Sequence, residues 1–181
     1  MDPAIGIIEL KSIAKGLSVT DAVVKKATVS ISASYPLSTG KYFILFSGPV
    51  AEVEESWKVG VASSSTELLN ECFIPYIDET VYATAMGKTF VEGIDSLAVF
   101  ESDSLASCVL FADMAVKAAD IRMVKMKLGQ GIGGKGYFVI SGLLHEVEAA
   151  AYALSQGECG LHRLTGKEII ANPYADTIER L

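Results

Sequence analysis

The chain has 181 residues, which suits one compact domain or two small ones. Its net charge of -7 argues against a nucleic-acid-binding protein, because such proteins carry a basic surface. Hydrophobic residues make up 50% of the chain, yet no apolar run approaches the ~20 residues that span a bilayer, and the N-terminus lacks the basic and apolar segments of a secretory signal.

The first half of the chain predicts short strands alternating with helices. Residues 4–10 (AIGIIEL) form an apolar run typical of a buried strand, and residues 41–47 (KYFILFS) are rich in aromatic and branched residues. Between residues 50 and 61, valines and Trp57 recur at helical spacing. The expected elements are a strand, a helix, two strands, a helix and a strand, at residues 4–10, 13–27, 28–35, 41–47, 50–61 and 71–74.

The second half repeats the first. Both AIGIIELKS (residues 4–12) and SLAVFESDS (residues 96–104) are apolar runs that end in Glu, with Ser three residues later. Glu101 follows Glu9 by 92 residues, whereas Gly142 follows Gly48 by 94, so the second copy has two extra residues near its glycine-rich segment. The sequence therefore predicts two β-α-β-β-α-β domains, at residues 1–87 and 96–181, joined by a linker at 88–95.

Each predicted domain belongs to the α/β (α+β) class. The short connections favour a small, mostly antiparallel sheet with helices packed on one face, of the ferredoxin-like split βαβ type. Each copy has about 90 residues, a marginal length for an independent core. Apolar surface is therefore expected to be buried by packing between copies and between chains.

The segment GQGIGGKG (residues 129–136) matches the G-x-G-x-x-G pattern of dinucleotide-binding turns. Such a site needs a helix N-terminus after the glycines, but here the segment joins two predicted strands, at residues 121–128 and 137–140. We interpret it as a strand-to-strand loop whose glycines adopt positive φ. Glycines also let several copies of a backbone crowd around one point, as the rim of a pore requires.

No pattern in the sequence predicts an enzyme. His145 and His162 have no third ligand at a useful spacing for zinc, and no Ser–His–Asp or Cys–His set is visible. The three cysteines, Cys72, Cys108 and Cys159, are odd in number and far apart. This favours the reducing cytoplasm over a disulfide framework.

The repeated order of motifs resembles the bacterial microcompartment (BMC) shell proteins. The motifs are an apolar strand ending in Glu, then D-x-x-x-K, a Gly-Lys turn, a strand ending in Gly and a V-x-x-V-E helix. Two copies in one chain look like the tandem-domain, trimer-forming class. The resemblance implies a structural protein of a microcompartment shell in the cytoplasm. Its partners would be two further copies of itself in a pseudohexameric homotrimer, and other BMC shell proteins at the edges of that tile.

The resemblance also implies a central pore for small polar metabolites, lined by the loops between the second and third strands of each copy. These loops comprise Pro36, Leu37, Ser38, Thr39, Gly40, Gly129, Gln130, Gly131, Ile132, Gly133 and Gly134. Their hydroxyl, amide and backbone groups would select neutral or anionic polar solutes, with Lys41 and Lys135 biasing the field toward anions.

Edge and cofactor residues follow from the same resemblance. The family's edge lysine falls on Lys25 and Lys117, and Asn172 takes the place of an arginine often found in the partner motif. Ser38 stands where some relatives carry a cysteine that binds an iron–sulfur cluster. A hydroxyl is a poor ligand for such a cluster, so we expect no metal and no cofactor.

Two other functions remain open at this point. One is a shell protein that conducts electrons through a bound metal centre or cluster. The other is a soluble, ligand-binding oligomer of ferredoxin-like fold with a saturable small-molecule site.

Overall fold

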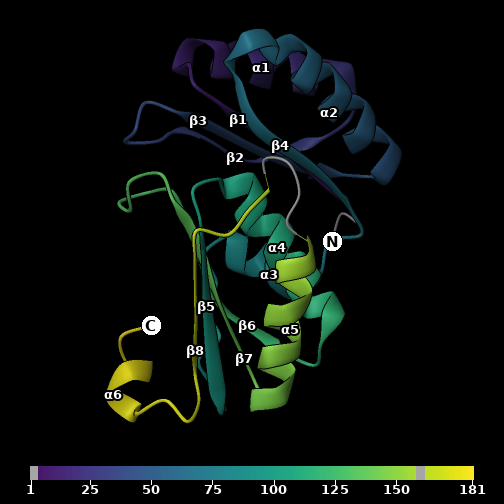
Figure 1. Cartoon of the computed structure of the whole chain (residues 1–181). Helices are drawn as coiled ribbons and strands as arrows, with labels where there is room; N and C mark the ends of the chain where they lie inside the picture. Colours follow the sequence, from purple (N-terminus) through teal and green to yellow (C-terminus); the bar gives the residue numbers. More distant parts are fainter. Residues whose placement is uncertain (1–3, 158–161) are drawn as a thin grey trace. The chain divides into compact units, whose positions relative to one another are not determined.

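The computed structural model describes residues 4–157 and 162–181 (Figure 1). The chain divides into two compact units. Unit 1 comprises Met1–Ile77 together with two short segments from later in the chain, Ser104–Ala106 and Gly129–Gly134. Unit 2 comprises Asp78–Asp103, Ser107–Leu128 and Lys135–Leu181.

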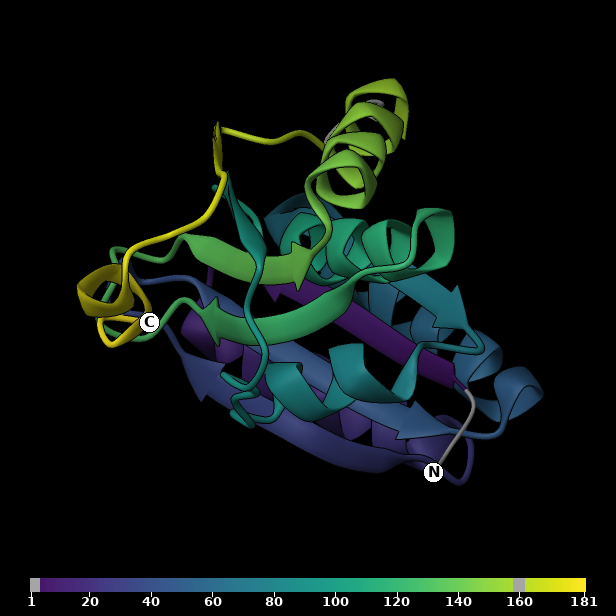
Figure 2. The same cartoon turned by 90° about the horizontal axis from the view of Figure 1, so that it is seen from below.

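Unit 1 is built on a four-stranded antiparallel sheet with the order β2-β3-β1-β4. Its strands are β1 (Ala4–Leu10), β2 (Ser30–Pro36), β3 (Tyr42–Gly48) and β4 (Leu68–Pro75). Its helices are α1 (Ile13–Lys26), α2 (Val50–Ser64) and the 3-10 turn η1 (Ser65–Glu67). Figure 1 shows α1 and α2 together on one face of this sheet, and in Figure 2 the purple strand β1 runs through its middle.

The core of unit 1 explains why β1 and β3 read as continuous apolar runs. Both strands are central in the sheet, and every residue in each is buried. Between the sheet and the helices, glycines allow close approach: a Cβ at Gly60 of α2 would lie 2.4 Å from Ile8 Cδ1. Helix α1 begins at the expected place because the Ser12 side chain accepts a hydrogen bond from the Lys15 backbone N–H at 3.2 Å.

Unit 2 repeats the sheet, with the antiparallel order β6-β7-β5-β8. Its strands are β5 (Ser96–Ser102), β6 (Arg122–Leu128), β7 (Gly136–Gly142) and β8 (Gly166–Ile170). Its helices are α3 (Glu79–Ala85), α5 (Leu144–Gly157), α6 (Ala175–Ile178) and α4 (Leu105–Ala118), whose first two residues belong to unit 1. In its core, the rings of Phe100 and Phe138 stack with centroids 5.0 Å apart.

The predicted fold class is confirmed: both halves have the order β-α-β-β-α-β around an antiparallel sheet. The sequence did not predict α3 and α6, which follow β4 and β8. Residues 78–87, assigned by the repeat to the first domain, pack in unit 2. The two compact units are defined by which residues pack together, whereas the predicted domains are defined by the sequence repeat. The domain bounds 1–87 and 96–181 therefore stay a prediction.

Candidate pore loops and edge residues

The loop between β2 and β3 is a tight, hydrogen-bonded turn. The Leu37 N–H donates to the Lys41 carbonyl at 2.8 Å, and the Gly40 N–H donates to the Leu37 carbonyl at 2.9 Å. Gly40 has a φ of +82°, which glycine adopts without steric cost. Leu37 is buried, whereas Ser38 and Thr39 are exposed, so the turn presents two hydroxyls to solvent.

The loop between β6 and β7 is the glycine-rich segment. Four of its glycines have positive φ: Gly129, Gly131, Gly133 and Gly134. The Gly134 N–H donates to the Gly129 carbonyl at 3.2 Å, which closes the loop. The interpretation as a strand-to-strand loop with positive-φ glycines is therefore confirmed. No helix follows this segment, so the geometry of a dinucleotide-binding turn is absent from it.

Unit 1 brings these two loops together. A Cβ at Gly129 would lie 2.5 Å from Leu37 Cδ2, and a Cβ at Gly134 would lie 2.8 Å from Thr39 Oγ1. The two loops thus pack against each other, and a side chain at either glycine would have to displace a side chain of the other loop. Gln130, Gly131 and Gly133 remain exposed, alongside Ser38 and Thr39, and offer amide, hydroxyl and backbone groups without full charge. That these residues line a pore stays a prediction.

The charge next to the glycine-rich loop is partly neutralised. Lys135 Nζ lies 2.8 Å from Glu101 Oε2, and this hydrogen bond and charge raise the pKa of Lys135. Both side chains are about half exposed, so the ion pair contributes little to stability. Glu101 offsets the charge of Lys135, which weakens the anion-attracting field that the sequence alone predicts at this loop.

Glu9 is a buried carboxyl group that sequence reasoning noted as a repeat marker but gave no role. Its Oε1 accepts the Ser104 hydroxyl at 2.5 Å and the Ala106 backbone N–H at 2.8 Å. Burial raises the pKa of Glu9, and the hydrogen bonds from Ala106 and Ser104 and the charge of Lys41 only partly oppose this. A Glu that ends an apolar strand in both copies was the signal that could have identified it.

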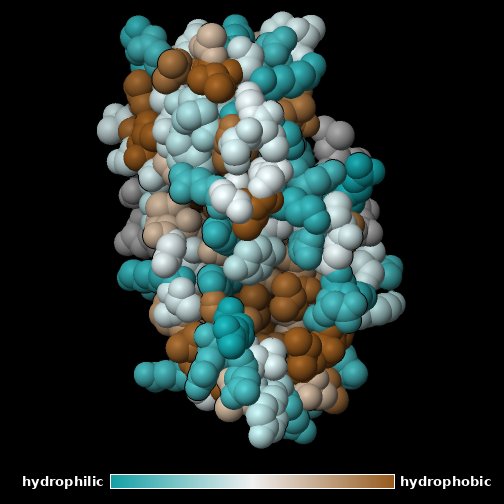
Figure 3. Space-filling model, turned by 90° about the vertical axis from the view of Figure 1, so that its left-hand side faces the viewer, coloured by the Kyte–Doolittle hydropathy of each residue, from teal (hydrophilic) through white to brown (hydrophobic). Residues whose placement is uncertain are grey.

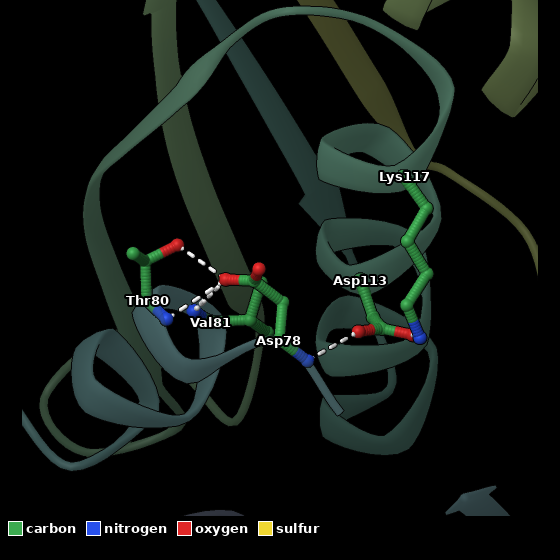
Figure 4. A network of polar contacts seen from close by, with 5 residues as sticks. All are labelled: Asp78, Thr80, Val81, Asp113 and Lys117. Carbon is green, nitrogen blue, oxygen red and sulfur yellow. Dashed lines mark hydrogen bonds and ion pairs between the residues drawn. The ribbon is translucent and has the colours of Figure 1, made fainter. Parts of the chain in front are cut away.

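The two lysines predicted at tile edges form ion pairs with an acid one helical turn earlier. Lys25 lies 2.6 Å from Asp21 on α1, and Lys117 lies 2.5 Å from Asp113 on α4. Asp113 also accepts the Asp78 backbone N–H at 2.9 Å, as Figure 4 shows. The third predicted edge residue, Asn172, is exposed after β8. The edge role of all three residues stays a prediction.

Cys72 and Cys108 are buried, and Cys159 lies outside the described residues. In residues 4–157 and 162–181, no three His, Cys, Asp or Glu side chains are grouped so that they could hold a metal ion. None of the helices found in these ranges is both long and apolar enough to span a membrane.

Unit 2 contains a partly open cavity of about 540 Å³. It lies between the segment 89–92 and strand β6, where the Phe90 N–H donates to the Val124 carbonyl at 2.8 Å. Ser141, whose buried hydroxyl makes no hydrogen bond, lines it together with Arg122 and Asp78. This cavity is where a small molecule would be sought if the protein were a ligand-binding oligomer.

Comparison with known proteins identifies the family to which the chain belongs. The BMC domain family matches it twice, at residues 4–77 and 96–173. The chain is 34% identical over 176 residues to the bacterial microcompartment shell protein PduT of Citrobacter freundii, covering 96% of this chain and 95% of that protein. It is also 31% identical over 64 residues to the carboxysome shell protein CcmK3 of Halothece sp., covering 35% of this chain and 63% of that protein.

Solved structures agree with this match. A microcompartments protein from Desulfitobacterium hafniense superimposes with a TM-score of 0.83 at 30% identity, covering 98% of each chain. The fused permuted hexameric shell protein MSM0275 from the RMM microcompartment has a TM-score of 0.63 at 22% identity, over 88% of this chain and 82% of that one, and so shares the fold. The chain therefore belongs to the BMC domain family and carries two such domains in tandem.

Proposed function

We propose that the chain is a structural protein of a bacterial microcompartment shell, which assembles as a homotrimeric, pseudohexameric tile with a central pore. The observation that carries this proposal is the packing of Leu37 against Gly129 and of Thr39 against Gly134. Two predicted pore loops that lie side by side in one chain are what a ring of six such loops around an axis requires. The family match to both halves supports the same role.

The pore chemistry follows from the exposed loop residues. The hydroxyls of Ser38 and Thr39 and the amide of Gln130 can replace part of the hydration shell of a polar solute. No acid lies within the two loops themselves, so a small anion meets no fixed negative charge there. We infer passage of small polar metabolites, with apolar ones slowed. Catalysis has no part in this role.

The position of the loops can be tested by electron microscopy. A single exposed cysteine, Gln130→Cys, would be introduced with Cys159→Ser and labelled with a maleimide–gold probe. Gold is expected at the centre of ring-shaped particles that tile into sheets at high concentration. The matched control is Tyr152→Cys on α5, whose side chain is 70% exposed and which should label the periphery. Gold at the rim of the particles in the Gln130→Cys variant would contradict the proposed position of the loops. Unlabelled protein that stays monomeric at high concentration would contradict the proposed assembly.

The rival role as an electron-conducting shell protein makes a different prediction. We propose that no iron–sulfur cluster is bound, because Ser38 offers a hydroxyl where a thiolate is needed. Protein purified without oxygen is expected to be colourless and to contain only trace iron by elemental analysis. Iron and acid-labile sulfide in amounts that match one cluster per trimer would overturn this.

A further inference from the structure

The cavity in unit 2 has the size of a small-molecule site. Its volume of about 540 Å³ falls within the range of about 300–1,000 Å³ that ligand pockets occupy, and every residue that lines it belongs to unit 2. Apolar side chains from the linker and β6, such as Phe90 and Val124, line it together with polar and charged ones. Apolar surface alone does not mark a site in this chain, because brown hydrophobic patches also interrupt the hydrophilic surface on the face drawn in Figure 3.

Ser141 on β7 is the residue that distinguishes this cavity. Only 1% of its surface is exposed, and its hydroxyl makes no hydrogen bond with any residue that the structure describes. Leaving a buried hydroxyl without a partner costs about 1–3 kcal/mol, so such groups are normally paired with protein, water or a ligand. Because Ser141 lines the cavity, a molecule bound there can provide the missing partner.

The sequence repeat shows why this hydroxyl has no partner. In unit 1 the counterpart of Ser141 is Ser47, 94 residues earlier, and its hydroxyl accepts a hydrogen bond from Ser32 at 3.2 Å. Ser32 lies at the register shift of β2, and Val124 lies at the same shift of β6. The valine side chain has neither donor nor acceptor. The residue that leaves Ser141 unpaired therefore also makes the cavity wall more apolar.

Arg122 adds a positive charge beside the same hydroxyl. It lies directly opposite Ser141 in the antiparallel pair of β6 and β7, so both side chains lie on one face of the sheet. Its counterpart in unit 1, opposite Ser47, is the uncharged Ser30. Arg122 Nη2 donates to the Gly93 carbonyl, which holds the guanidinium against the linker and leaves its other N–H donors for a ligand. A guanidinium and a hydroxyl together suit a carboxylate.

Two acids also line the cavity, and they restrict the kind of ligand. Asp78 Oδ1 accepts hydrogen bonds from Thr80 and Val81, as Figure 4 shows, whereas its Oδ2 accepts none within residues 4–157 and 162–181. Glu92 in the linker is the second acid. A molecule with a carboxylate alone would meet two negative charges and one positive charge. A ligand that also carries an ammonium group matches both signs.

We propose that this cavity binds a small zwitterion with an apolar body, the simplest example being an α-amino acid with a large apolar side chain. The carboxylate of the ligand accepts hydrogen bonds from Ser141 and Arg122. Its ammonium group lies toward Asp78 and Glu92, and its side chain packs on Val124. All these groups belong to unit 2, so the site is complete in one chain and does not depend on the proposed tile or pore.

Calorimetric titration of the full chain with phenylalanine and with leucine tests the ligand class. At least one of them is expected to bind saturably, at one site per chain. The corresponding amine, which lacks the carboxylate, and the corresponding acid, which lacks the ammonium group, should each bind at least tenfold more weakly. An acid or amine that binds as tightly as the amino acid would overturn the proposal. So would the absence of saturable binding by both amino acids at millimolar concentration, which would mean that the cavity holds water only.

Three variants test the residues. Ser141→Ala should weaken binding by about tenfold or more without loss of stability, because it removes a hydroxyl that has no protein partner. The matched control is Ser47→Ala, which removes a paired hydroxyl in unit 1 and should leave binding unchanged. Val124→Ser recreates the serine pair of unit 1 and should also weaken binding. Unchanged affinity in the Ser141→Ala variant would refute the site.

The charge of Arg122 is tested separately. Arg122 is exposed, so Arg122→Gln should fold, with an unchanged far-ultraviolet circular dichroism spectrum. The variant keeps hydrogen-bond donors but loses the charge, and it should bind the amino acid at least tenfold more weakly. Because the corresponding amine has no carboxylate, its affinity should not fall in this variant. An equal loss for amino acid and amine would contradict the assignment of the carboxylate to Arg122.

Discussion

Leu37 fills the space that a β-carbon at position 129 would need. The Leu37 Cδ2 atom lies 2.5 Å from that position, and Leu105 Cδ1 lies 3.1 Å from it. Gly129 also has a φ of +73°, a conformation that costs other residues about 1 kcal/mol or more. We therefore expect Gly129→Ala to lower the free energy of unfolding by about 2–4 kcal/mol, measured by urea denaturation.

Gly133→Ala is the matched control for this substitution. Gly133 lies in the same loop with a φ of +64°, but a Cβ there would meet nothing within 4 Å. Gly133→Ala should therefore lower the free energy of unfolding only by the cost of the positive φ, about 1 kcal/mol. Equal losses in the two variants would mean that Leu37 yields freely and that the two loops do not restrain each other.

The pH dependence of stability should reveal the buried Glu9. Its pKa is raised by burial, so the folded state holds a proton more strongly than the unfolded state. The contribution of Glu9 is therefore most favourable below the unfolded pKa near 4.5, and it is lost as the pH rises through the folded pKa, by about 1.4 kcal/mol per pH unit between the two values. Glu9→Gln keeps the oxygen that accepts from Ser104 and Ala106 and removes the charge.

We expect Glu9→Gln to gain stability relative to wild type as the pH rises from 4.5 to 8, in denaturation curves measured at one protein concentration. If the curves for Glu9→Gln and wild type run parallel across this range, the carboxyl group is ionised at no cost and its pKa is not raised.

The repeat made most of the fold predictable, because Glu9 and Glu101 mark equivalent strands and thereby fix the order of everything between them. Helix α3 escaped prediction because seven residues hold less than two helical periods, and its signal lies in the cap, Asp78. The glycine loop was located correctly from composition. Its contact with Leu37 was not, because it joins segments far apart in the chain and no local pattern encodes it.

Asp78, which caps helix α3, should affect the pH dependence of stability in the direction opposite to Glu9. Its Oδ1 accepts the N–H groups of Thr80 at 2.8 Å and Val81 at 3.3 Å. Burial alone would raise the pKa of Asp78, but the hydrogen bond from the Thr80 hydroxyl at 2.6 Å, these two N–H groups and the charge of Lys117 outweigh it, and the pKa is lowered. Its contribution is thus present above the unfolded pKa near 3.8 and lost as the pH falls through the folded pKa.

Asp78→Ala should therefore cost about 1 kcal/mol at pH 7, and its difference from wild type should shrink as the pH is lowered below about 4. Asp78→Asn, which can still cap the helix, serves as the control and should recover most of the loss. Thermal unfolding at a series of pH values measures both. If the stability difference between Asp78→Ala and wild type instead grows as the pH falls, the ionised carboxylate is not what stabilises the helix N-terminus.

Gly60 on α2 tests close packing against helix propensity. Alanine is favoured over glycine in helices by about 1 kcal/mol, but a Cβ here would lie 2.4 Å from Ile8 Cδ1 and 2.9 Å from Val23 Cγ2. Both neighbours are fully buried, so we expect Gly60→Ala to destabilise unit 1 by about 1–3 kcal/mol.

Ile8→Val removes the nearer methyl group and alone should cost about 1 kcal/mol. Because the second change vacates the space that the first one needs, the double variant should lose less than the two single losses added, a coupling measured by urea denaturation of all four proteins. Additive losses would show that the helix shifts away from the sheet as a body, in which case the Ile8 contact does not set its distance.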